Sequence, residues 1–337
     1  TGVDPRVAHS LVEADLQRRA LVEEWRGPAA TSDGRAVELL ANVGDAAASE
    51  AAHEGGLAQG IGLARTELAF LKSTAEPGVT DQVRAYAQVI APWRGSKVVV
   101  RTLDAGSDKP VAYATLPGEE NPALGVRGIR TSGPYPSILA NQLDAIAIAA
   151  MSAPETRVWV MAPMVSTIPE AQWFSAMVRQ RCETYGVDLR AGIMVEAPSV
   201  AILIDQFLEA VDFVSIGTND LTQYTMAADR TSADLAEYAD PWQPAPLSLI
   251  AQVARAGARA GKPVGVCGEA GADPLLACVL VGMGVSSLSM ASGAIPGVGA
   301  MLATVTMDQC EAAARAVVGA RDGGEGRYRA RRALGLM

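Results

Sequence analysis

The sequence predicts an α/β protein folded as a (β/α)8 barrel, the TIM-barrel class, after an N-terminal helical segment. Eight short apolar runs alternate with segments of helical pattern along the chain, and this alternation is typical of a parallel sheet. Eight strand–helix units are the number that closes into a barrel. In five of the eight runs a polar residue stands at the carboxyl end, which is the end where such barrels carry their active sites.

The predicted elements follow one another through most of the chain. Strands are expected at 38–43, 60–67, 97–104, 158–164, 191–196, 213–220, 263–269 and 287–290. Helices are expected near 45–53, 80–92, 169–184, 246–260 and 273–282. The Gly-, Pro- and charge-rich segment 106–127 predicts a long loop, and loops of this length inside compact domains are usually either functional or disordered. The predicted organisation is a helical linker at 1–33, a barrel at 34–318 and a C-terminal tail at 319–337.

Composition limits the class of protein. The 337 residues are 49% apolar but only 5% aromatic, so we expect a large core built from Ala, Val, Leu and Ile. The net charge of −9 argues against a nucleic-acid binder and requires locally placed arginines for any anionic ligand. No apolar run reaches membrane-spanning length, and no signal peptide is recognisable. The four cysteines lack C-x-x-C pairing, which favours reduced thiols in a cytoplasmic protein.

Cations gather at the predicted active-site end of the barrel. They are Arg65, Arg101, Lys109, Arg127 and Arg230. Guanidinium groups match the oxygens of phosphate and carboxylate, so an anion that carries both is the expected ligand. The alternative for the two loop residues, Lys109 and Arg127, is that they form ordinary surface ion pairs.

Two carboxylates also stand at this end. Glu196 and Asp220 follow successive strands, and two carboxylates together with substrate oxygens and water are the usual way to hold Mg²⁺. Asn219 precedes Asp220 and offers a further oxygen. The alternative is that both acids pair with the neighbouring arginines.

Cys267 follows an apolar run and precedes Gly268-Glu269, so we expect it at the same end of the barrel. A thiol with a pKa near its usual value of about 8.5 is mostly protonated at neutral pH and can serve as an acid. The alternative is a small buried apolar side chain, which is how we interpret Cys182, Cys278 and Cys310. His9 and His53 lie in helical stretches away from this end, and neither is given a role.

With these residues in place, the chain resembles the Enzyme I family, the phosphoenolpyruvate–protein phosphotransferases of the bacterial sugar phosphotransferase system. The resemblance is to the phosphoenolpyruvate-binding C-terminal domain and runs from about residue 36 to about residue 300. The motifs that carry it are Gly62 through Glu67, Arg101 through Asp104 with Asp108-Lys109, Glu120 through Arg127, Gly192 through Pro198, Ser215 through Arg230 and Gly265 through Glu269. The stretches 101–106 and 162–167 look most like the actinobacterial branch.

The resemblance implies a dimeric barrel that binds phosphoenolpyruvate with Mg²⁺. Glu196 and Asp220 would be the metal ligands, and Cys267 would protonate the enolpyruvate carbon to give pyruvate. The phosphate and carboxylate of the substrate would be held by Arg65, Arg101, Arg230 and Asn219, with Lys109 and Arg127 in support.

One departure from the family is informative. In the full family protein the phosphoryl group passes to a histidine on an N-terminal domain, in a Gly-Gly-x-x-Ser-His type motif that does not occur here. The chain therefore looks like the C-terminal part of a longer protein, with the donor site but without the phosphohistidine domain or the surface that binds the small phosphocarrier protein. We expect it to be inactive in turnover on its own.

Three other hypotheses remain at this point. A pyruvate phosphate dikinase C-terminal domain would share the barrel and many of the same residues, although the compact stretch between Arg230 and Pro246 favours Enzyme I. A lyase that forms pyruvate or oxaloacetate on a related barrel is disfavoured by the arginines and by Cys267. Finally, the missing histidine domain is compatible with a dimerisation and regulatory module without turnover.

Overall fold

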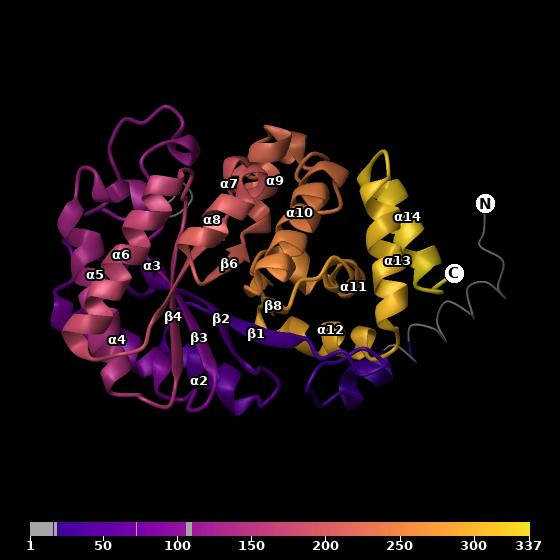
Figure 1. Cartoon of the computed structure of the whole chain (residues 1–337), viewed down its shortest axis with the longest axis horizontal. Coiled ribbons are helices and arrows are strands. Elements are labelled where there is room, and N and C mark those ends of the chain that lie inside the picture. Colours follow the sequence, from indigo (N-terminus) through magenta and orange to yellow (C-terminus); the bar gives the residue numbers. More distant parts are fainter. Residues whose placement is uncertain (1–15, 17–18, 72, 106–109) are drawn as a thin grey trace.

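Eight parallel strands pair in sequence order and close into a barrel in the computed structural model of the chain, with β8 beside β1 (Figure 1). The structure describes residues 16, 19–71, 73–105 and 110–337. The strands are β1 (Glu38–Val43), β2 (Gly60–Arg65), β3 (Lys97–Arg101), β4 (Arg157–Ala162), β5 (Arg190–Val195), β6 (Phe213–Ile216), β7 (Val264–Val266) and β8 (Ser287–Met290). The predicted (β/α)8 barrel is confirmed.

Helices lie between the strands and cover the outside of the barrel (Figure 1). They are α2 (Ala46–Glu54), α3 (Thr66–Ala69), α4 (Val79–Ile90), α5 (Pro136–Met151), α6 (Ile168–Tyr185), α7 (Pro198–Ile202), α8 (Ile204–Ala210), α9 (Thr218–Met226), α10 (Pro244–Ala260), α11 (Pro274–Gly282), α12 (Ile295–Leu302), α13 (Met307–Val318) and α14 (Gly323–Ala333). In the part of the chain that the structure describes, no helix is both long and apolar enough to cross a bilayer.

Alternation along each strand divides its side chains between two apolar clusters. In β3, Val98 and Val100 join the large core between strands and helices, whereas Val99 points inward. The inner cluster also contains Trp159, Met194 and Cys267. Because successive side chains of a strand point to opposite faces, a residue two places beyond an inward-facing one also faces the barrel interior.

The prediction that the strand at 213–220 includes Asn219 and Asp220 is wrong. β6 ends at Ile216, and the two polar residues lie in the first turn of α9. Gly217 is the N-cap of this helix, and Asp220 supplies an acidic side chain to its first turn, where a negative charge is favourable near the unpaired backbone N–H groups. β3 and β7 are also shorter than expected, ending at Arg101 and Val266.

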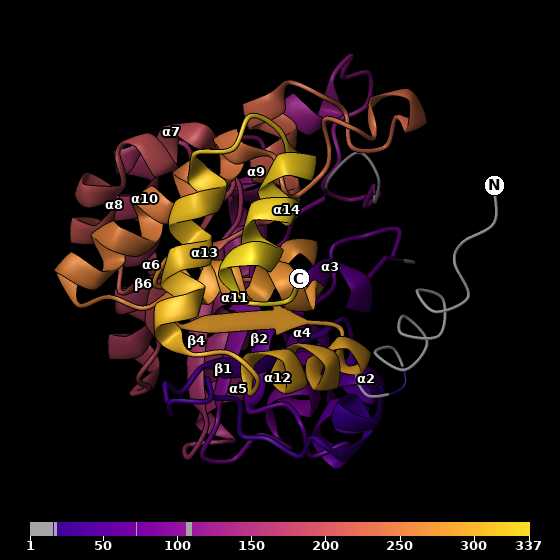
Figure 2. The same cartoon turned by 90° about the vertical axis from the view of Figure 1, so that its right-hand side faces the viewer.

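The two ends of the described chain pack on the barrel. Residues 19–24 are helical, as expected for the linker, and the Trp25 side chain packs against the main core. The segment 319–337, predicted as a tail, contains α14, which lies alongside α13 (Figure 2).

Helices α11 and α13 approach closely at Gly282. A Cβ at this position would lie 2.0 Å from the Cys310 carbonyl oxygen, so Gly282→Ala forces the two backbones apart. We expect the free energy of unfolding to fall by about 1–3 kcal/mol. Gly293→Ala is the matched control, since its Cβ would meet nothing within 4 Å. Urea unfolding measures the free energy of unfolding of both variants. Equal values would contradict the conclusion that the close approach of α11 and α13 requires glycine at position 282.

Candidate functional site

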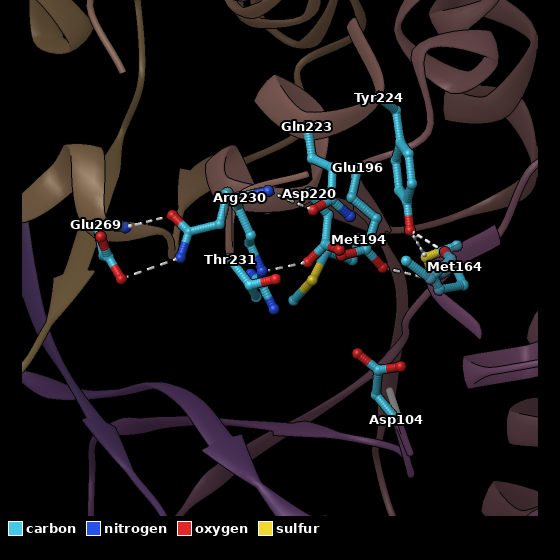
Figure 3. A network of polar contacts seen from close by, with 12 residues as sticks. Asp104, Met164, Met194, Glu196, Asp220, Gln223, Tyr224, Arg230, Thr231 and Glu269 are labelled. Atoms are coloured by element: carbon cyan, nitrogen blue, oxygen red, sulfur yellow. Dashed lines mark hydrogen bonds and ion pairs between the residues drawn. The ribbon is translucent and has the colours of Figure 1, made fainter. Parts of the chain in front are cut away.

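A cavity of about 600 Å³ opens at the carboxyl ends of the strands. Among the described residues that line it are four arginines and five carboxylates: Arg65, Arg101, Arg127, Arg230, Glu67, Asp104, Glu196, Asp220 and Glu269. Figure 3 shows Glu196, Asp220 and Arg230 gathered on one side, with the Asp104 carboxylate facing them. The cavity is therefore strongly charged, which is typical of a site for a charged ligand rather than an apolar one.

Strand alternation explains why several predicted residues face this cavity. Leu63, Val99 and Met194 point into the barrel, and Arg65, Arg101 and Glu196 each stand two residues further along and line the cavity. Cys267 comes one residue after β7 and belongs to the inner cluster itself. The same two-residue period thus delivers groups from four strands to one place.

The Arg101 guanidinium is buried between two carboxylates. Its Nη2 donates to Glu67 Oε1 at 2.7 Å, and its Nη1 lies 3.2 Å from Asp104 Oδ2. These carboxylates, together with Glu196, raise the pKa of Arg101 above its usual value despite burial. Glu67 and Asp104 were not among the predicted site residues, although both stand within three positions of a predicted arginine.

Arg127 is held in place by three side chains. It forms a bidentate pair with Asp104, at 3.0 Å from Nε and 2.7 Å from Nη2. Its Nη1 donates to Asp220 Oδ1 at 2.9 Å and to the Tyr224 hydroxyl at 3.2 Å. The side chain is only 4% exposed, so the alternative of a surface ion pair is wrong for Arg127. Lys109 lies outside the described residues.

Asp220 connects the two sides of this network. Besides Arg127, it pairs with Arg230 at 3.5 Å. Arg101 and Arg127 together lower the pKa of the buried Asp104 carboxyl in spite of its burial. The alternative hypothesis, that the two acids pair with arginines, therefore holds for Asp220 in this structure. Asp220 links Arg127 to Arg230 within the charged cluster.

Glu196, like Glu67, has one buried carboxylate oxygen without a hydrogen-bond partner among the described residues. Its Oε1 accepts the Met164 backbone N–H at 2.5 Å, while the buried Oε2 has no hydrogen-bond partner among the described residues. Burial first, and then the neighbouring Asp220 and Asp104, raise the pKa of Glu196 to about 8. A buried acid oxygen without a partner is costly, and a divalent cation shared with Asp220 is a group that would satisfy it.

The protein oxygens alone do not complete a metal site. In the described ranges no cluster of three or more His, Cys, Asp or Glu side chains is arranged to hold a metal ion. The arrangement fits a cation that takes Glu196 and Asp220 from the protein and its remaining ligands from substrate and water, as is usual for Mg²⁺.

Cys267 is buried at the wall of the cavity. Its thiol donates to the Ile216 carbonyl at 3.4 Å, and burial raises its pKa to about 11. The group therefore stays protonated near neutral pH and is suited to give up a proton rather than to attack as a thiolate. Cys278 and Cys310 lie in α11 and α13 and are buried, as interpreted from the sequence, whereas Cys182 in α6 is only partly buried, so this interpretation is wrong for Cys182.

Asn219 and Arg65 differ in how they are held. The Asn219 amide donates to Glu269 at 3.3 Å and accepts the Glu269 backbone N–H at 3.2 Å, so it ties α9 to the segment after Cys267. The Arg65 Nε is buried and has no hydrogen-bond partner among the described residues. A buried donor of this kind is available to an anion in the cavity.

The fold and this site define a (β/α)8 barrel protein with a strongly charged cavity at the carboxyl ends of its strands. The chain belongs to the PEP-utilising enzyme family, whose PEP-binding domain it matches over residues 19–307. The family resemblance inferred from the sequence is thereby confirmed.

Curated relatives agree with this assignment. The chain is 48% identical over 319 residues to a phosphoenolpyruvate-protein phosphotransferase of Streptomyces coelicolor, covering 94% of this chain and 56% of the relative. It is 43% identical over 297 residues to the protein of the same name from Haloferax volcanii, covering 85% of this chain and 52% of the relative. Multiphosphoryl transfer protein 2 of Escherichia coli is 36% identical over 314 residues, which cover 91% of this chain and 36% of the relative. The chain thus spans about half the length of the first two relatives.

Proposed function

We propose that this chain is the phosphoenolpyruvate- and Mg²⁺-binding domain of a phosphoenolpyruvate-protein phosphotransferase. The observation that carries the proposal is a cavity lined by four arginines and by Glu196, whose buried Oε2 has no hydrogen-bond partner among the described residues. Phosphoenolpyruvate carries a phosphate and a carboxylate, and guanidinium groups are suited to both. The names of the relatives support the same substrate.

The site residues predicted from the sequence each have a role in this proposal. Arg65, Arg101 and Arg230 hold the phosphate and carboxylate of the substrate, with Asn219, Lys109 and Arg127 assisting. Glu196 and Asp220 would hold Mg²⁺, which when bound offsets negative charge on the phosphoryl oxygens. The arginines stabilise the charge that spreads over the phosphoryl group during transfer. Arg101 and Arg127 are held by carboxylates before substrate arrives, so these two groups need little reorganisation during the reaction.

Cys267 supplies the remaining chemical step. Once the phosphoryl group has left, the enolpyruvate carbon must gain a proton to become the methyl group of pyruvate. The Cys267 thiol is protonated at neutral pH because burial raises its pKa to about 11. It lies in the same cavity as the arginines, and it gives its proton to that carbon.

The acceptor in this proposal is a histidine on an N-terminal domain. That domain would pass the phosphoryl group to a small phosphocarrier protein, and the phosphoryl group would then be used for sugar uptake. We propose that the protein acts in the cytoplasm. The chain covers 56% of the Streptomyces relative, which leaves length in that relative for such a domain. We further propose that the barrel acts as a homodimer, and sedimentation at several concentrations tests this part separately.

The decisive experiment is a calorimetric titration of phosphoenolpyruvate into the chain, with and without Mg²⁺. We expect binding that depends on Mg²⁺. A histidine domain from a relative, added in trans, should then become phosphorylated as pyruvate is released. Absence of binding under every condition would overturn the proposal. Binding without any transfer would instead favour a regulatory module.

A further inference from the structure

The centre of the arginine network is occupied by a carboxylate that the proposed reaction does not use. Asp104 follows β3, and its side chain is only 4% exposed. It contacts Arg127 through both carboxylate oxygens, at 3.0 and 2.7 Å, and Arg101 at 3.2 Å. One acid therefore contacts, and partly offsets the charge of, two of the cations that would bind substrate.

The charge balance of the whole cavity also indicates that carboxylates offset the arginines. Its described lining contains four arginines and five carboxylates, so with every group ionised the acids exceed the cations by one. Each of three arginines contacts at least one acid: Arg101 contacts Glu67 and Asp104, Arg127 contacts Asp104 and Asp220, and Arg230 contacts Asp220. A site balanced in this way offers little attraction to an anion that arrives alone.

We propose that Asp104 is a specificity-determining residue, which makes anion binding at this site conditional on a divalent cation. The inference rests on the proposed function for the identity of the cation site. A cation held by Glu196 and Asp220 engages the acid that Arg127 and Arg230 share, so the Arg127 Nη1 that donates to Asp220 becomes available to the anion. Asp104 remains in place, orienting Arg101 and Arg127 while keeping metal-free anions out.

The test uses inorganic sulfate, which keeps its two negative charges throughout the neutral range. Calorimetric titration in EDTA compares the native chain with Asp104→Asn. The substitution preserves size and one acceptor oxygen but removes the charge that contacts both guanidinium groups. We expect the metal-free affinity for sulfate to rise at least about tenfold, because charges in contact interact strongly in a partly buried site. Equal or weaker binding by the variant would overturn the proposal.

The matched control is Asp205→Asn. Asp205 pairs with Arg259 at 2.8 Å on the exposed surface, where the two side chains are 72% and 63% exposed, and we expect its sulfate binding to equal that of the native chain. If Asp104→Asn does not fold, Glu67→Gln provides the second variant, since Glu67 pairs with one arginine of the described residues, Arg101, at 2.7 Å. Its sulfate affinity should rise in the same direction by a smaller factor, and no rise would count against the proposal.

A measurement on the native chain needs no variant. Mg²⁺ should strengthen sulfate binding, and equally tight binding in EDTA would reject the role of Asp104 as a barrier to metal-free anions.

The parallel titration with phosphoenolpyruvate and Mg²⁺ separates the two proposals. If phosphoenolpyruvate binds but the sulfate comparison fails, only the role of Asp104 is lost. If sulfate behaves as expected but phosphoenolpyruvate does not bind, the proposed function fails instead.

Discussion

Replacing Glu196 with alanine should abolish Mg²⁺-dependent phosphoenolpyruvate binding, with a loss of affinity of at least about 100-fold. The substitution removes the only carboxylate of the proposed pair that has an open oxygen in this structure. Asp220 already contacts Arg127 and Arg230, so it cannot replace Glu196 as a second ligand from the same position. Metal sites with one protein carboxylate fewer hold Mg²⁺ much more weakly.

Calorimetry with and without Mg²⁺ measures this loss. Glu196→Gln is the informative companion, because its amide oxygen can still accept the Met164 N–H at the place of Oε1 while the charge is gone. We expect it to fail in the same way. Glu209→Ala, an exposed position on α8, should bind as the native chain does. Native-like, Mg²⁺-dependent binding by both Glu196 variants would show that the cation sits elsewhere.

Replacing Cys267 with serine should separate substrate binding from product formation. A serine hydroxyl is a far weaker acid than a thiol, and loss of a positioned general acid typically lowers the rate by about 10² to 10⁴. We expect pyruvate release, with a histidine domain supplied in trans, to fall by at least about 100-fold. The affinity for phosphoenolpyruvate with Mg²⁺ should change by less than about threefold, since the thiol binds no charge of the substrate.

The control for this experiment is Cys182→Ser. Cys182 lies in α6, where its sulfur contacts the backbone N–H and carbonyl of Leu189, and it does not line the cavity. Its activity should match the native chain. Pyruvate release at the native rate by Cys267→Ser would mean that another group delivers the proton.

The sequence alone predicted the fold well because the barrel signal is local. Each strand is a short apolar run, and the rule of alternation then places Arg65, Arg101 and Glu196 on the inner face. This rule needs only the order of residues within each strand. Sequence reasoning misplaced the residues just beyond several strands, most clearly 217–220, since the apolar run of β6 passes directly into the first turn of α9.

The counterions of the site could not be predicted in the same way. Glu67 and Asp104 are recognisable as acids near functional arginines, but which guanidinium each one contacts depends on distances between separate elements. Tyr224 illustrates the point. Its hydroxyl accepts from Arg127 and donates to the Ala123 carbonyl in η1 (Pro122–Leu124), and so it joins α9 to a loop about 100 residues earlier in the chain. No local pattern signals such a contact.

The two-residue alternation of the strands also has a consequence for how this protein can change. A deletion of one residue inside β5 would exchange the faces of Val195 and Glu196, turning the carboxylate toward the helices and an isopropyl group toward the cavity. The amino-acid composition would barely change, yet the chemistry would be lost. Insertions in the loops carry no such penalty. Over evolutionary time we therefore expect length variation among relatives to collect in the loops, while the count of residues within each of these strands stays fixed.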